Sequence, residues 1–336
     1  MLKDLLSKVT QNQDLTYDEA KAAVEEIMSG ECSEALISSY LTALAMKGET
    51  DDEIAGSADG MRSKAEVVEL GCHALDVVGT GGDKSNSFNI STTAAFVAAA
   101  AGVKIAKHGN RAASSKSGTA DCLEALGVKI DCDKNLMRSS LDKNNIMFFF
   151  AQKYHSAMRF VGPVRKEIGI RTVFNILGPL TNPGKADRMV LGVFSEEYVE
   201  KIAKALVKLG VHDAMVVHGK DGLDEISACD ETLVAEVRGT DIKYYTITPE
   251  DFGMERVSKD DLLGGTPQEN AEITRNVLNG GGTQAQQNAV ALNAGACIYV
   301  EHDGITLADG IKTAQEIMKS GKANNILEGF VKTTNE

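Results

Sequence analysis

The sequence predicts an α/β protein, with a small N-terminal helical domain at residues 1–70 and a larger α/β domain at residues 71–336 built on a mainly parallel central sheet. Two observations lead to this prediction. Apolar residues recur at helical spacing in the first region, and near-continuous apolar runs alternate with helical patterns from Ala74 onward. A chain of 336 residues with 43% hydrophobic and 25% charged residues has the composition of a globular protein of one or two domains.

The N-terminal region contains the start and stop signals of short helices. Thr16 and Glu19 predict a capping box, in which each side chain accepts a hydrogen bond from the other residue's backbone, and Gly30 is a stop signal. Thr50 and Glu53 repeat the capping signature. Because no strand-like stretch occurs in this region, we expect three or four short helices there.

The larger region alternates between two kinds of segment. Its apolar runs are typical of strands that helices cover on both faces of a parallel sheet. Strands are expected at residues 74–78, 103–106, 146–151, 189–194 and 214–218. Helices are expected at residues 91–101, 117–126, 195–209, 267–278 and 284–300, and β-rich stretches at 232–237 and 241–247. Since ligands of open α/β sheets bind beyond the carboxyl ends of strands, chemistry is expected after Val78, Ala106 and His218.

Charge and cysteine content argue against several classes of function. Lys and Arg total 35 against 48 Asp and Glu, so the net charge of -13 opposes binding to nucleic acid. The six cysteines form no C-x-x-C pair, which argues against a zinc site or a disulfide scaffold and suits a cytoplasmic location. We expect no export signal and no membrane segment, because the longest apolar run, residues 94–102, is far shorter than the roughly 20 residues that span a bilayer.

A glycine-rich loop follows the first expected strand. In DVVGTGGDKSNSFNIST, residues 76–92, Gly79, Gly81 and Gly82 let backbone N–H groups approach an anion without a Cβ in the way. The helix that begins near Asn89 offers a second anion site at its N-terminus. The loop is neither a Walker loop nor a dinucleotide fingerprint. Considered alone, it fits both a phosphate site and a tight β-to-α connection.

Two further strand ends carry charged groups. KHGNRAASSKS, residues 107–117, concentrates cations and hydroxyls on an acidic protein, which indicates an anion site, although solvated loops also have such a composition. HGKDGLDEIS, residues 218–227, places Asp221, Asp224 and Glu225 after another strand. Carboxylates beside a phosphate pocket repel the ligand unless a hard cation lies between them, so this acidic trio predicts Mg²⁺. Exposed acids in an Asp-Gly turn are the alternative.

Five motifs, in a consistent order, resemble those of the anthranilate phosphoribosyltransferase family. They are GTGGD (79–83), NIST (89–92), KHGNRAASS (107–115), RTVFNILGPLTNP (171–183) and DGLDE (221–225). The resemblance covers nearly the whole chain and implies a fold close to that of the pyrimidine nucleoside phosphorylases. It implies that the segment near residues 160–185 packs with the helical domain, that the active site lies in the hinge cleft, and that two chains form a homodimer through their helical parts. The implied substrates are anthranilate and 5-phosphoribosyl-1-pyrophosphate.

The resemblance also implies roles for individual residues. Those implied to be catalytic are Lys107, Asn110 and Arg165. Arg165 suits the carboxylate of anthranilate, because a guanidinium can bind a carboxylate through two hydrogen bonds. The residues implied to hold Mg²⁺ are Ser91, Asp224 and Glu225. The residues implied to bind substrate are Gly79, Gly82, Asp83, Ser87, Asn89, Ile90, Ser91, Thr92, Lys107, His108, Gly109, Asn110, Arg111, Ala112, Ala113, Ser114, Ser115, Thr119 and Arg165.

The implied reaction needs no covalent enzyme intermediate. The amine of anthranilate attacks the anomeric carbon of the ribose as pyrophosphate leaves, so the protein's contribution is to place the reactants and to stabilise the leaving group. Two alternatives stay open. A nucleoside phosphorylase of the same fold is one, against which the acidic pair at 224 and 225 argues. A non-catalytic relative that binds nucleic acid is the other, which the net charge opposes.

Overall fold

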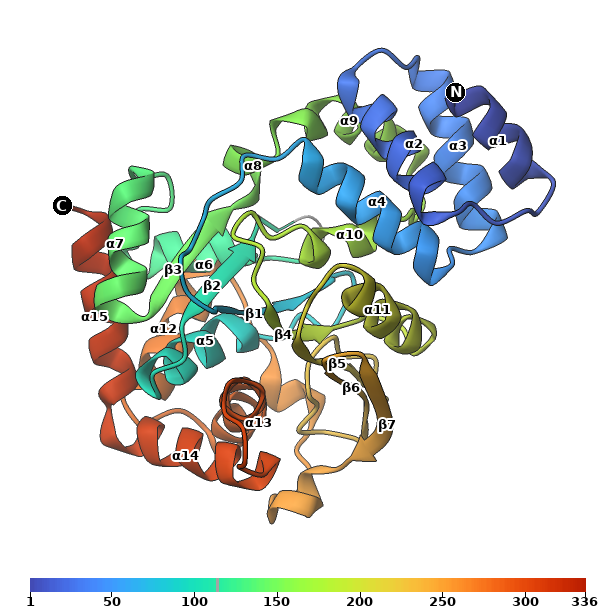
Figure 1. Cartoon of the computed structure of the whole chain (residues 1–336). Coiled ribbons are helices and arrows are strands. Elements are labelled where there is room, and N and C mark those ends of the chain that lie inside the picture. The colour runs from blue at the N-terminus through green and yellow to red at the C-terminus, as the bar shows by residue number, and fades with distance from the viewer. Residues whose placement is uncertain (113–114) are drawn as a thin grey trace.

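The computed structural model describes residues 1–112 and 115–336, and it consists of a helical bundle beside a larger α/β unit (Figure 1). The bundle contains the first four helices, α1 (Leu2–Thr10), α2 (Tyr17–Ser29), α3 (Glu34–Lys47) and α4 (Asp51–Ser63). Both expected capping boxes are confirmed. The Thr16 side chain accepts a hydrogen bond from the N–H of Glu19 at the start of α2, and Thr50 does the same for Glu53 at the start of α4.

A seven-stranded sheet forms the centre of the α/β unit. Its strands are β1 (Leu75–Gly79), β2 (Ile105–Gly109), β3 (Ile146–Phe150), β4 (Arg188–Gly192), β5 (Asp213–Gly219), β6 (Thr232–Arg238) and β7 (Asp241–Ile247). Their order across the sheet is β3-β2-β1-β4-β5-β6-β7. The first five strands in this order are parallel, and β6 and β7 are antiparallel additions at one edge. The predicted α/β class with a mainly parallel sheet is therefore confirmed.

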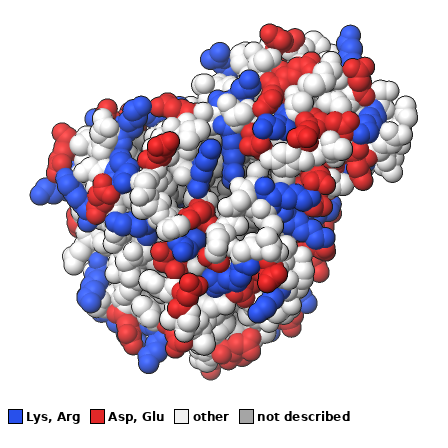
Figure 2. Space-filling model, viewed as in Figure 1, with Lys and Arg blue, Asp and Glu red and all other residues white. Residues whose placement is uncertain are grey.

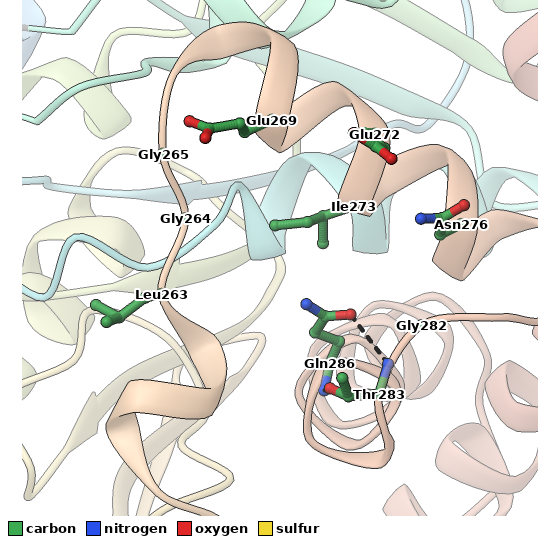
Figure 3. Close-up of a pocket in the computed structure, with 10 residues that line it drawn as sticks. All are labelled: Leu263, Gly264, Gly265, Glu269, Glu272, Ile273, Asn276, Gly282, Thr283 and Gln286. Carbon is green, nitrogen blue, oxygen red and sulfur yellow. Dashed lines mark hydrogen bonds between the residues drawn. The ribbon is translucent and has the colours of Figure 1, made fainter.

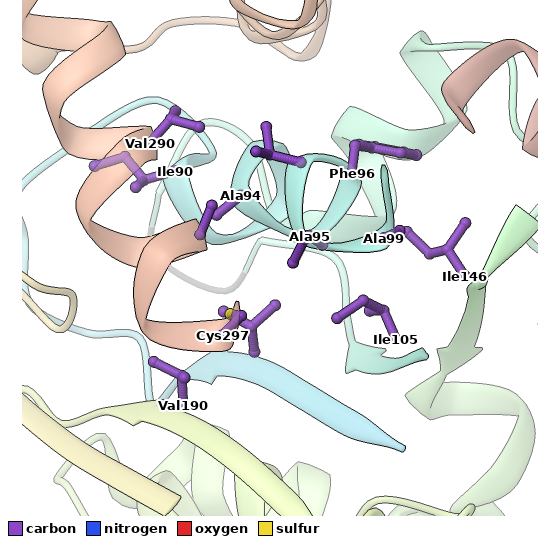
Figure 4. Packing of buried hydrophobic residues seen from close by; sticks show 14 of the residues in the cluster. Ile90, Ala94, Ala95, Phe96, Ala99, Ile105, Ile146, Val190, Val290 and Cys297 are labelled. Carbon is purple, nitrogen blue, oxygen red and sulfur yellow. The ribbon is translucent and has the colours of Figure 1, made fainter. Parts of the chain in front are cut away.

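Helices cover both faces of the sheet. On one face α5 and α13 pack closely, because small residues such as Ala94 and Ala95 of α5 leave room for Ile105 and Cys297 (Figure 4). On the other face α11 packs against β5 and contacts α4 of the bundle. The remaining bounds are α5 (Ile90–Ala100), α6 (Thr119–Ala125), α7 (Lys134–Asn144), α8 (Ala151–Tyr154), α11 (Glu197–Lys208), α12 (Pro267–Leu278), α13 (Gln284–Glu301), α14 (Leu307–Ser320) and α15 (Lys322–Thr334), with 3-10 turns at Ser156–Phe160, Pro249–Phe252 and Lys259–Leu262.

Four of these helices, α7, α8, α14 and α15, are absent from the sequence-based prediction. The capping box of α14 pairs Thr306 with Asp309 instead of the Glu or Gln that defines the usual signature. The start of α7 is capped by Asp133 alone, and α15 follows directly after the left-handed Gly321 that ends α14. Across the described residues, no helix combines the length and the apolar character needed to cross a membrane.

The segment between β3 and β4 returns to the helical bundle. It contains α9 (Gly162–Ile168), which contacts α3, and α10 (Phe174–Leu180), which contacts α4. Val161 and Val164 lie in one buried apolar cluster with Tyr40 of α3, and this cluster continues to Leu191 on the α11 face of the sheet. Buried apolar contacts thus join the bundle to the α/β unit. The boundary expected near residue 70 stays a prediction.

Candidate functional site

The candidate site lies where β1 and β4 end side by side. After β1 the chain crosses to β2 on one side, and after β4 it crosses to β5 on the other, which is the arrangement that opens a ligand crevice in such sheets. Gly79 and Gly192 are directly paired at these two ends. A Cβ on Gly79 would lie 2.3 Å from Oδ2 of Asp224, and one on Gly192 would lie 1.7 Å from the Asp224 carbonyl oxygen. Both glycines are therefore required, and sequence analysis does not single out Gly192.

The loop after β1 has an unusual backbone. Gly81 and Gly82 have φ angles of 70° and 78°, and Lys84 and Asn86 follow at 61° and 54°. Left-handed backbone is uncommon at residues other than glycine, and such conformations can turn successive N–H groups toward one anion. Backbone hydrogen bonds of 2.9 Å at both ends of the pairing join residues 86–88 to residues 262–264. The loop is consequently held in a defined shape from its outer side.

The polar side chains of this loop make local contacts. The N–H of Ser85 donates to Oδ1 of Asp83 at 3.3 Å, and the Ser85 hydroxyl donates to Oγ of Ser87 at 3.1 Å. Asp83 and Ser87, both predicted to bind substrate, remain partly exposed. They therefore keep oxygen atoms that a ligand could reach.

Asn89 precedes α5, but its side chain does not cap the helix. Its Oδ1 instead accepts hydrogen bonds from the Ser117 hydroxyl at 3.1 Å and from Nδ2 of Asn270 at 2.8 Å. Asn270 is buried on α12, 181 residues further along the chain, so no local pattern could have predicted this contact. The first N–H groups of α5 therefore use other acceptors, which are the Phe88 carbonyl oxygen for Ile90 and the Glu225 carboxylate for Ser91.

The first turn of α5 contains three predicted site residues. The side chain of Ile90 is buried, so only its backbone could meet a ligand. The N–H of Ser91 donates to Oε1 of Glu225 at 3.2 Å. The hydroxyl of Thr92 is buried and has no hydrogen-bond partner among the described residues. A buried hydroxyl without a partner costs free energy, which a bound anion would recover.

Asp224 and Glu225 bring two carboxylates to the same point. Oδ2 of Asp224 accepts a hydrogen bond from the N–H of Gly81 at 2.6 Å. Burial, with the negative charges of Asp83 and Glu225, raises the pKa of Asp224 well above its usual value. Burial also raises the pKa of Glu225 to about 7, although the charge of Lys107 acts in the opposite direction. The negative charge of these two carboxylates is therefore not fully compensated by nearby positive groups.

This pair of carboxylates fits a hard divalent cation. Mg²⁺ typically binds one or two carboxylates and takes its other ligands from phosphates and water. Asp221, the third member of the predicted trio, is engaged elsewhere, because its carboxylate accepts hydrogen bonds from the N–H of Leu223 and the hydroxyl of Ser227. Within the described ranges no cluster of three or more His, Cys, Asp or Glu residues is arranged to hold a metal. A cation at Asp224 and Glu225 would therefore depend on substrate oxygens.

Lys107 is buried, with 2% of its surface exposed, and its amine contacts the middle of β1. Its Nζ donates to the carbonyl oxygen of Val77 and lies 3.4 Å from Oγ of Ser91. Burial lowers the pKa of Lys107, while the charges of Asp76 and Glu225 act in the opposite direction. A buried amine with so few acceptors is suited to an incoming phosphate oxygen.

Asp76 and Asn182 form a buried polar link that sequence analysis leaves unassigned. Oδ1 of Asp76 accepts the N–H of His108 at 3.2 Å, and Oδ2 accepts Nδ2 of Asn182 at 2.8 Å. Asn182 also donates to the carbonyl oxygen of Ala106 at 2.7 Å. Burial raises the pKa of Asp76 to about 6. The link holds the end of β2 against β1, and its one sequence signal is the position of Asn182 within a family motif.

The segment after β2 contains further predicted residues, of which Ala113 and Ser114 lie outside the described residues. A Cβ on Gly109 would lie 2.9 Å from Cβ of Thr119, so the close approach of α6 requires glycine there. The carbonyl oxygen of Asn110 accepts the N–H of Ala120 at 3.1 Å, which also ties this loop to α6.

Arg111 is already paired within the protein. Its guanidinium forms ion pairs with Asp121 at 3.0 Å and with Glu124 at 2.5 Å. Asp121 also accepts the N–H of Ala112 at 2.9 Å, and the hydroxyl of Ser115 donates to a carbonyl oxygen of its own loop. Arg111 therefore contributes less unneutralised charge to the site than Lys107 does.

His108 and His155 form a buried pair of rings whose centroids are 5.1 Å apart. Nδ1 of His108 lies 3.1 Å from the Gly178 carbonyl oxygen, and the other three ring nitrogens have no partner among the described residues. Burial lowers the pKa of His108 to about 3 and that of His155 to about 4, so both rings are neutral at pH 7.

Arg165, the residue predicted to bind anthranilate, lies on α9. Its guanidinium is 5.7 Å from the centre of the Phe174 ring, and burial lowers the pKa of Arg165.

Two hollows of the surface can be compared with the candidate site. One pocket, of about 470 Å³, includes none of the predicted site residues in its wall (Figure 3). Its lining consists of Leu263, Gly264, Gly265, Glu269, Glu272, Ile273, Asn276, Gly282, Thr283 and Gln286. The other hollow is seen where the helical bundle meets the α/β unit, and Lys and Arg side chains border it (Figure 2). Polar groups at the strand ends, not the size of the first pocket, mark the candidate site.

Comparisons with known proteins agree with this organisation. The family model described as "Glycosyl transferase family, helical bundle domain" matches residues 3–65, and the one described as "Glycosyl transferase family, a/b domain" matches residues 71–324. An anthranilate phosphoribosyltransferase of Methanobrevibacter smithii is 52% identical over 335 residues, covering 100% of both chains. One of Lachnoclostridium phytofermentans is 50% identical, covering 100% of this chain and 99% of the relative.

Solved structures give the same result. A crystal structure of anthranilate phosphoribosyltransferase from Thermus thermophilus matches with a TM-score of 0.93 and 43% identity, covering 98% of this chain and 99% of that chain. The enzyme from Saccharomyces cerevisiae in complex with PRPP and Mg matches with a TM-score of 0.89 and 31% identity, covering 99% of this chain and 98% of that chain. The predicted family resemblance is thereby confirmed.

Proposed function

This chain belongs to the anthranilate phosphoribosyltransferase family, and we propose that it transfers the phosphoribosyl group of 5-phosphoribosyl-1-pyrophosphate to the amine of anthranilate, with release of pyrophosphate. One observation carries the proposal. Segments from three strand ends meet, with the N–H of Gly81 2.6 Å from the carboxylate of Asp224, and Ser91 in contact with both Glu225 and Lys107. Backbone donors, a buried amine and two acids around one point suit a sugar bearing phosphates and a metal ion.

The leaving group would be bound by the loop after β1 and the start of α5. The N–H groups of Thr80, Gly81 and Ser91 already donate to Gly192, Asp224 and Glu225. The backbone N–H groups of residues 82–83 and of Thr92 would face developing negative charge without needing to reorganise. Thr92 adds a buried hydroxyl that has no hydrogen-bond partner in the described part of the chain. Lys107 adds a positive charge that is already buried before the ligand binds. These groups would stabilise departing pyrophosphate more than the intact substrate, which is the condition for a faster chemical step.

Asp224 and Glu225, with the hydroxyl of Ser91, would hold Mg²⁺. When bound, the ion would neutralise charge on the pyrophosphate oxygens. The raised pKa values of the two acids support this assignment, because such carboxylates gain most from a nearby cation. The S. cerevisiae relative, described in complex with PRPP and Mg, supports it as well.

Anthranilate would be bound between α9 and the segment after β2. Arg165 is assigned to the carboxylate and Asn110 to the polar edge of the ring, while the neutral ring of His108 suits the aromatic face. The S. cerevisiae relative in complex with 4-fluoroanthranilate supports a site for an aromatic acid in this fold. No side chain of the protein needs to act as a nucleophile, because the amine of anthranilate is itself the attacking group.

One assay tests the proposal. The purified protein is mixed with anthranilate, 5-phosphoribosyl-1-pyrophosphate and Mg²⁺, and the decay of anthranilate fluorescence is followed. We expect decay that stops when a chelator is added and resumes with excess Mg²⁺. A flat trace from folded protein would contradict the function. Release of a base from a nucleoside by inorganic phosphate, without Mg²⁺, would instead indicate a nucleoside phosphorylase of this fold.

We also propose a homodimer, a cytoplasmic location and a domain boundary near residue 70. The dimer is supported by apolar side chains exposed on the bundle and beside α9, with Met46 83% and Ile170 47% exposed. Six cysteines with free thiols support a reducing compartment. The boundary is supported by residues 64–74, which contain no helix or strand. Sedimentation at the mass of a single chain would contradict the dimer.

A further inference from the structure

Arg171 holds two parts of the candidate site together. It lies in the connection between α9 and α10, and its Nη2 donates to the carbonyl oxygen of Gly82 at 2.5 Å. The same guanidinium lies 3.9 Å from the centre of the Phe194 ring, in the connection after β4. This one side chain therefore contacts the loops that follow both β1 and β4. Arg171 forms no ion pair within the described ranges. Its positive charge is instead used in the hydrogen bond to Gly82 and in the cation–π contact with Phe194.

The contact line continues from Phe194 into the helical bundle. The Phe194 and Tyr198 rings pack edge to face, with centroids 5.3 Å apart. The Tyr198 hydroxyl donates to Oε2 of Glu49 at 3.3 Å. Glu49 is only 4% exposed and lies in the connection between α3 and α4, while Tyr198 is in the first turn of α11, next to the bundle (Figure 1). Four residues thus connect the glycine-rich loop with the bundle.

Arg171 contacts the loop from the segment that packs on the bundle, whereas the bonds of Thr80 with Gly192 and Phe194 join the loop to the end of β4. The pairing with residues 262–264 fixes the outer side of the loop, whereas Arg171 reaches it from the segment that packs on the bundle. Gly82 has a φ of 78°, so its carbonyl group belongs to the left-handed part of the loop, where the backbone is least constrained. A planar guanidinium can stack on a ring and donate to a carbonyl oxygen at once, which an ammonium group cannot do equally well.

We propose that Arg171 is a positioning residue for the glycine-rich loop, and that Phe194, Tyr198 and Glu49 couple the position of the helical bundle to the binding of the sugar diphosphate. This inference rests on the proposed function for its substrate. Arg165, assigned to anthranilate, precedes Arg171 by six residues in the same segment. Movement of that segment on binding anthranilate would therefore change the position of the glycine-rich loop. Each substrate would then strengthen the binding of the other.

The test compares Arg171→Ala and Arg171→Lys with the wild-type enzyme. We expect Arg171→Ala to raise the KM for 5-phosphoribosyl-1-pyrophosphate about tenfold, as loss of one hydrogen bond from a charged donor does, with less than about a threefold change in kcat. Arg171→Lys should restore part of this loss. In the wild type the KM for the sugar diphosphate should fall as anthranilate is raised, and this dependence should disappear in Arg171→Ala. An unchanged KM in a folded, active Arg171→Ala protein would overturn the proposal.

Two further variants complete the test. Tyr198→Phe keeps the ring and removes the hydroxyl bond to Glu49, so we expect an increase of about threefold in the same KM. A wild-type KM in Tyr198→Phe would contradict the proposal that Tyr198 and Glu49 couple the helical bundle to binding of the sugar diphosphate. The matched control is Arg159→Ala, because the Arg159 guanidinium lies over the Phe160 ring at 4.7 Å without contacting the glycine-rich loop. It should leave the kinetics unchanged, and an equal rise in KM would overturn the specific role of Arg171.

A measurement without substrates separates this inference from the proposed function. Amide hydrogen exchange of residues 80–88 is followed in the ligand-free wild type and in Arg171→Ala. We expect faster exchange in the variant, because the loop loses its anchor on the bundle side. Equal exchange rates would overturn the positioning role even if the wild type catalyses another reaction. A wild type that fails to consume anthranilate, combined with faster exchange in Arg171→Ala, would overturn the function alone.

Discussion

Two regions of the molecule contain a lysine with a buried side chain near acidic groups, and they differ in how the lysine charge is paired. In the helical bundle, Nζ of Lys47 lies 2.6 Å from Asp14 and 2.9 Å from Glu53. Glu53 is fully buried and also accepts the N–H groups of Leu15 and Thr50. At the strand ends, Lys107 forms no ion pair within the described ranges and contacts a carbonyl and a hydroxyl instead.

The difference shows how a structural charge can be told from a binding charge. A buried charge that is paired and fully hydrogen-bonded stabilises a fold by internal contacts, whereas one without such partners costs stability until a ligand arrives. At the strand ends, burial lowers the pKa of Lys107 and raises that of Glu225, so burial disfavours the charged form of each group. We therefore expect substitutions in the bundle to change stability and those at the strand ends to change activity.

The largest effect expected is on the stability of the bundle. Glu53→Ala removes the acceptor for Lys47 and for two backbone N–H groups, so we expect the free energy of unfolding to fall by about 3 kcal/mol. The value lies at the low end for a broken buried pair because Asp14 still contacts Lys47. Urea unfolding measures the change. Turnover per folded molecule should stay at the wild-type level, and a loss of turnover would break the comparison.

The reverse result is expected for Lys107→Ala. Removal of a preorganised donor to the leaving group should lower kcat by about a hundredfold, or about 2.7 kcal/mol, without a comparable loss of stability. Lys47→Ala is the matched control, since it removes the other buried lysine. The control should unfold at lower urea concentration and keep its kcat. A near-normal rate in Lys107→Ala would remove this residue from the mechanism.

Glu225→Gln tests whether the acid at the strand ends binds Mg²⁺ instead of stabilising the fold. The amide keeps the acceptor for the N–H of Ser91 but removes a negative charge, so we expect the Mg²⁺ concentration at half-maximal rate to rise roughly tenfold. Because desolvation of the carboxylate is relieved, the metal-free protein should be at least as stable as the wild type. A marked loss of stability in urea would show that Glu225 stabilises the fold, as Glu53 does in the helical bundle.

The two buried histidines predict a pH dependence of stability. Burial lowers the pKa of His155 from 6.5 to about 4, so the unfolded state binds more protons than the folded state between these values. Stability is therefore retained above pH 6.5 and is lost as the pH falls toward 4, by up to about 1.4 kcal/mol per pH unit for each such group. His155→Gln should flatten this slope in urea unfolding at pH 7, 6 and 5. An unchanged slope would contradict the buried neutral ring.

The smallest effect is expected at an exposed helix cap of the bundle. Thr16→Ala removes the acceptor for the N–H of Glu19, so we expect a loss of about 1 kcal/mol in the free energy of unfolding and no change in kcat. Thr16→Ser keeps the oxygen and serves as the control. Equal losses in both variants would show that the capping hydrogen bond is not the cause.

Much of the fold could be predicted because its signals are local. Thr16 and Glu19 are three residues apart, and the apolar run predicted as a strand at 146–151 is a single short stretch that contains β3 (Ile146–Phe150). Motifs for the glycine-rich loop and the acidic pair were equally visible, since each is a short stretch with a distinct composition. The helices α14 and α15 escaped prediction because their start signals depart from the usual ones.

The sequence by itself determined the class of fold, the family and the kinds of chemical group present at each strand end. Only the tertiary structure decided which of these groups meet. Gly192 beside Asp224, Asn270 on Asn89 and Arg171 on Gly82 are contacts between residues far apart in the chain. The physical reason is that strand order and helix packing, which arise from burial of the whole core, set such distances, whereas hydrogen-bonding patterns within a few residues set only helices, strands and turns.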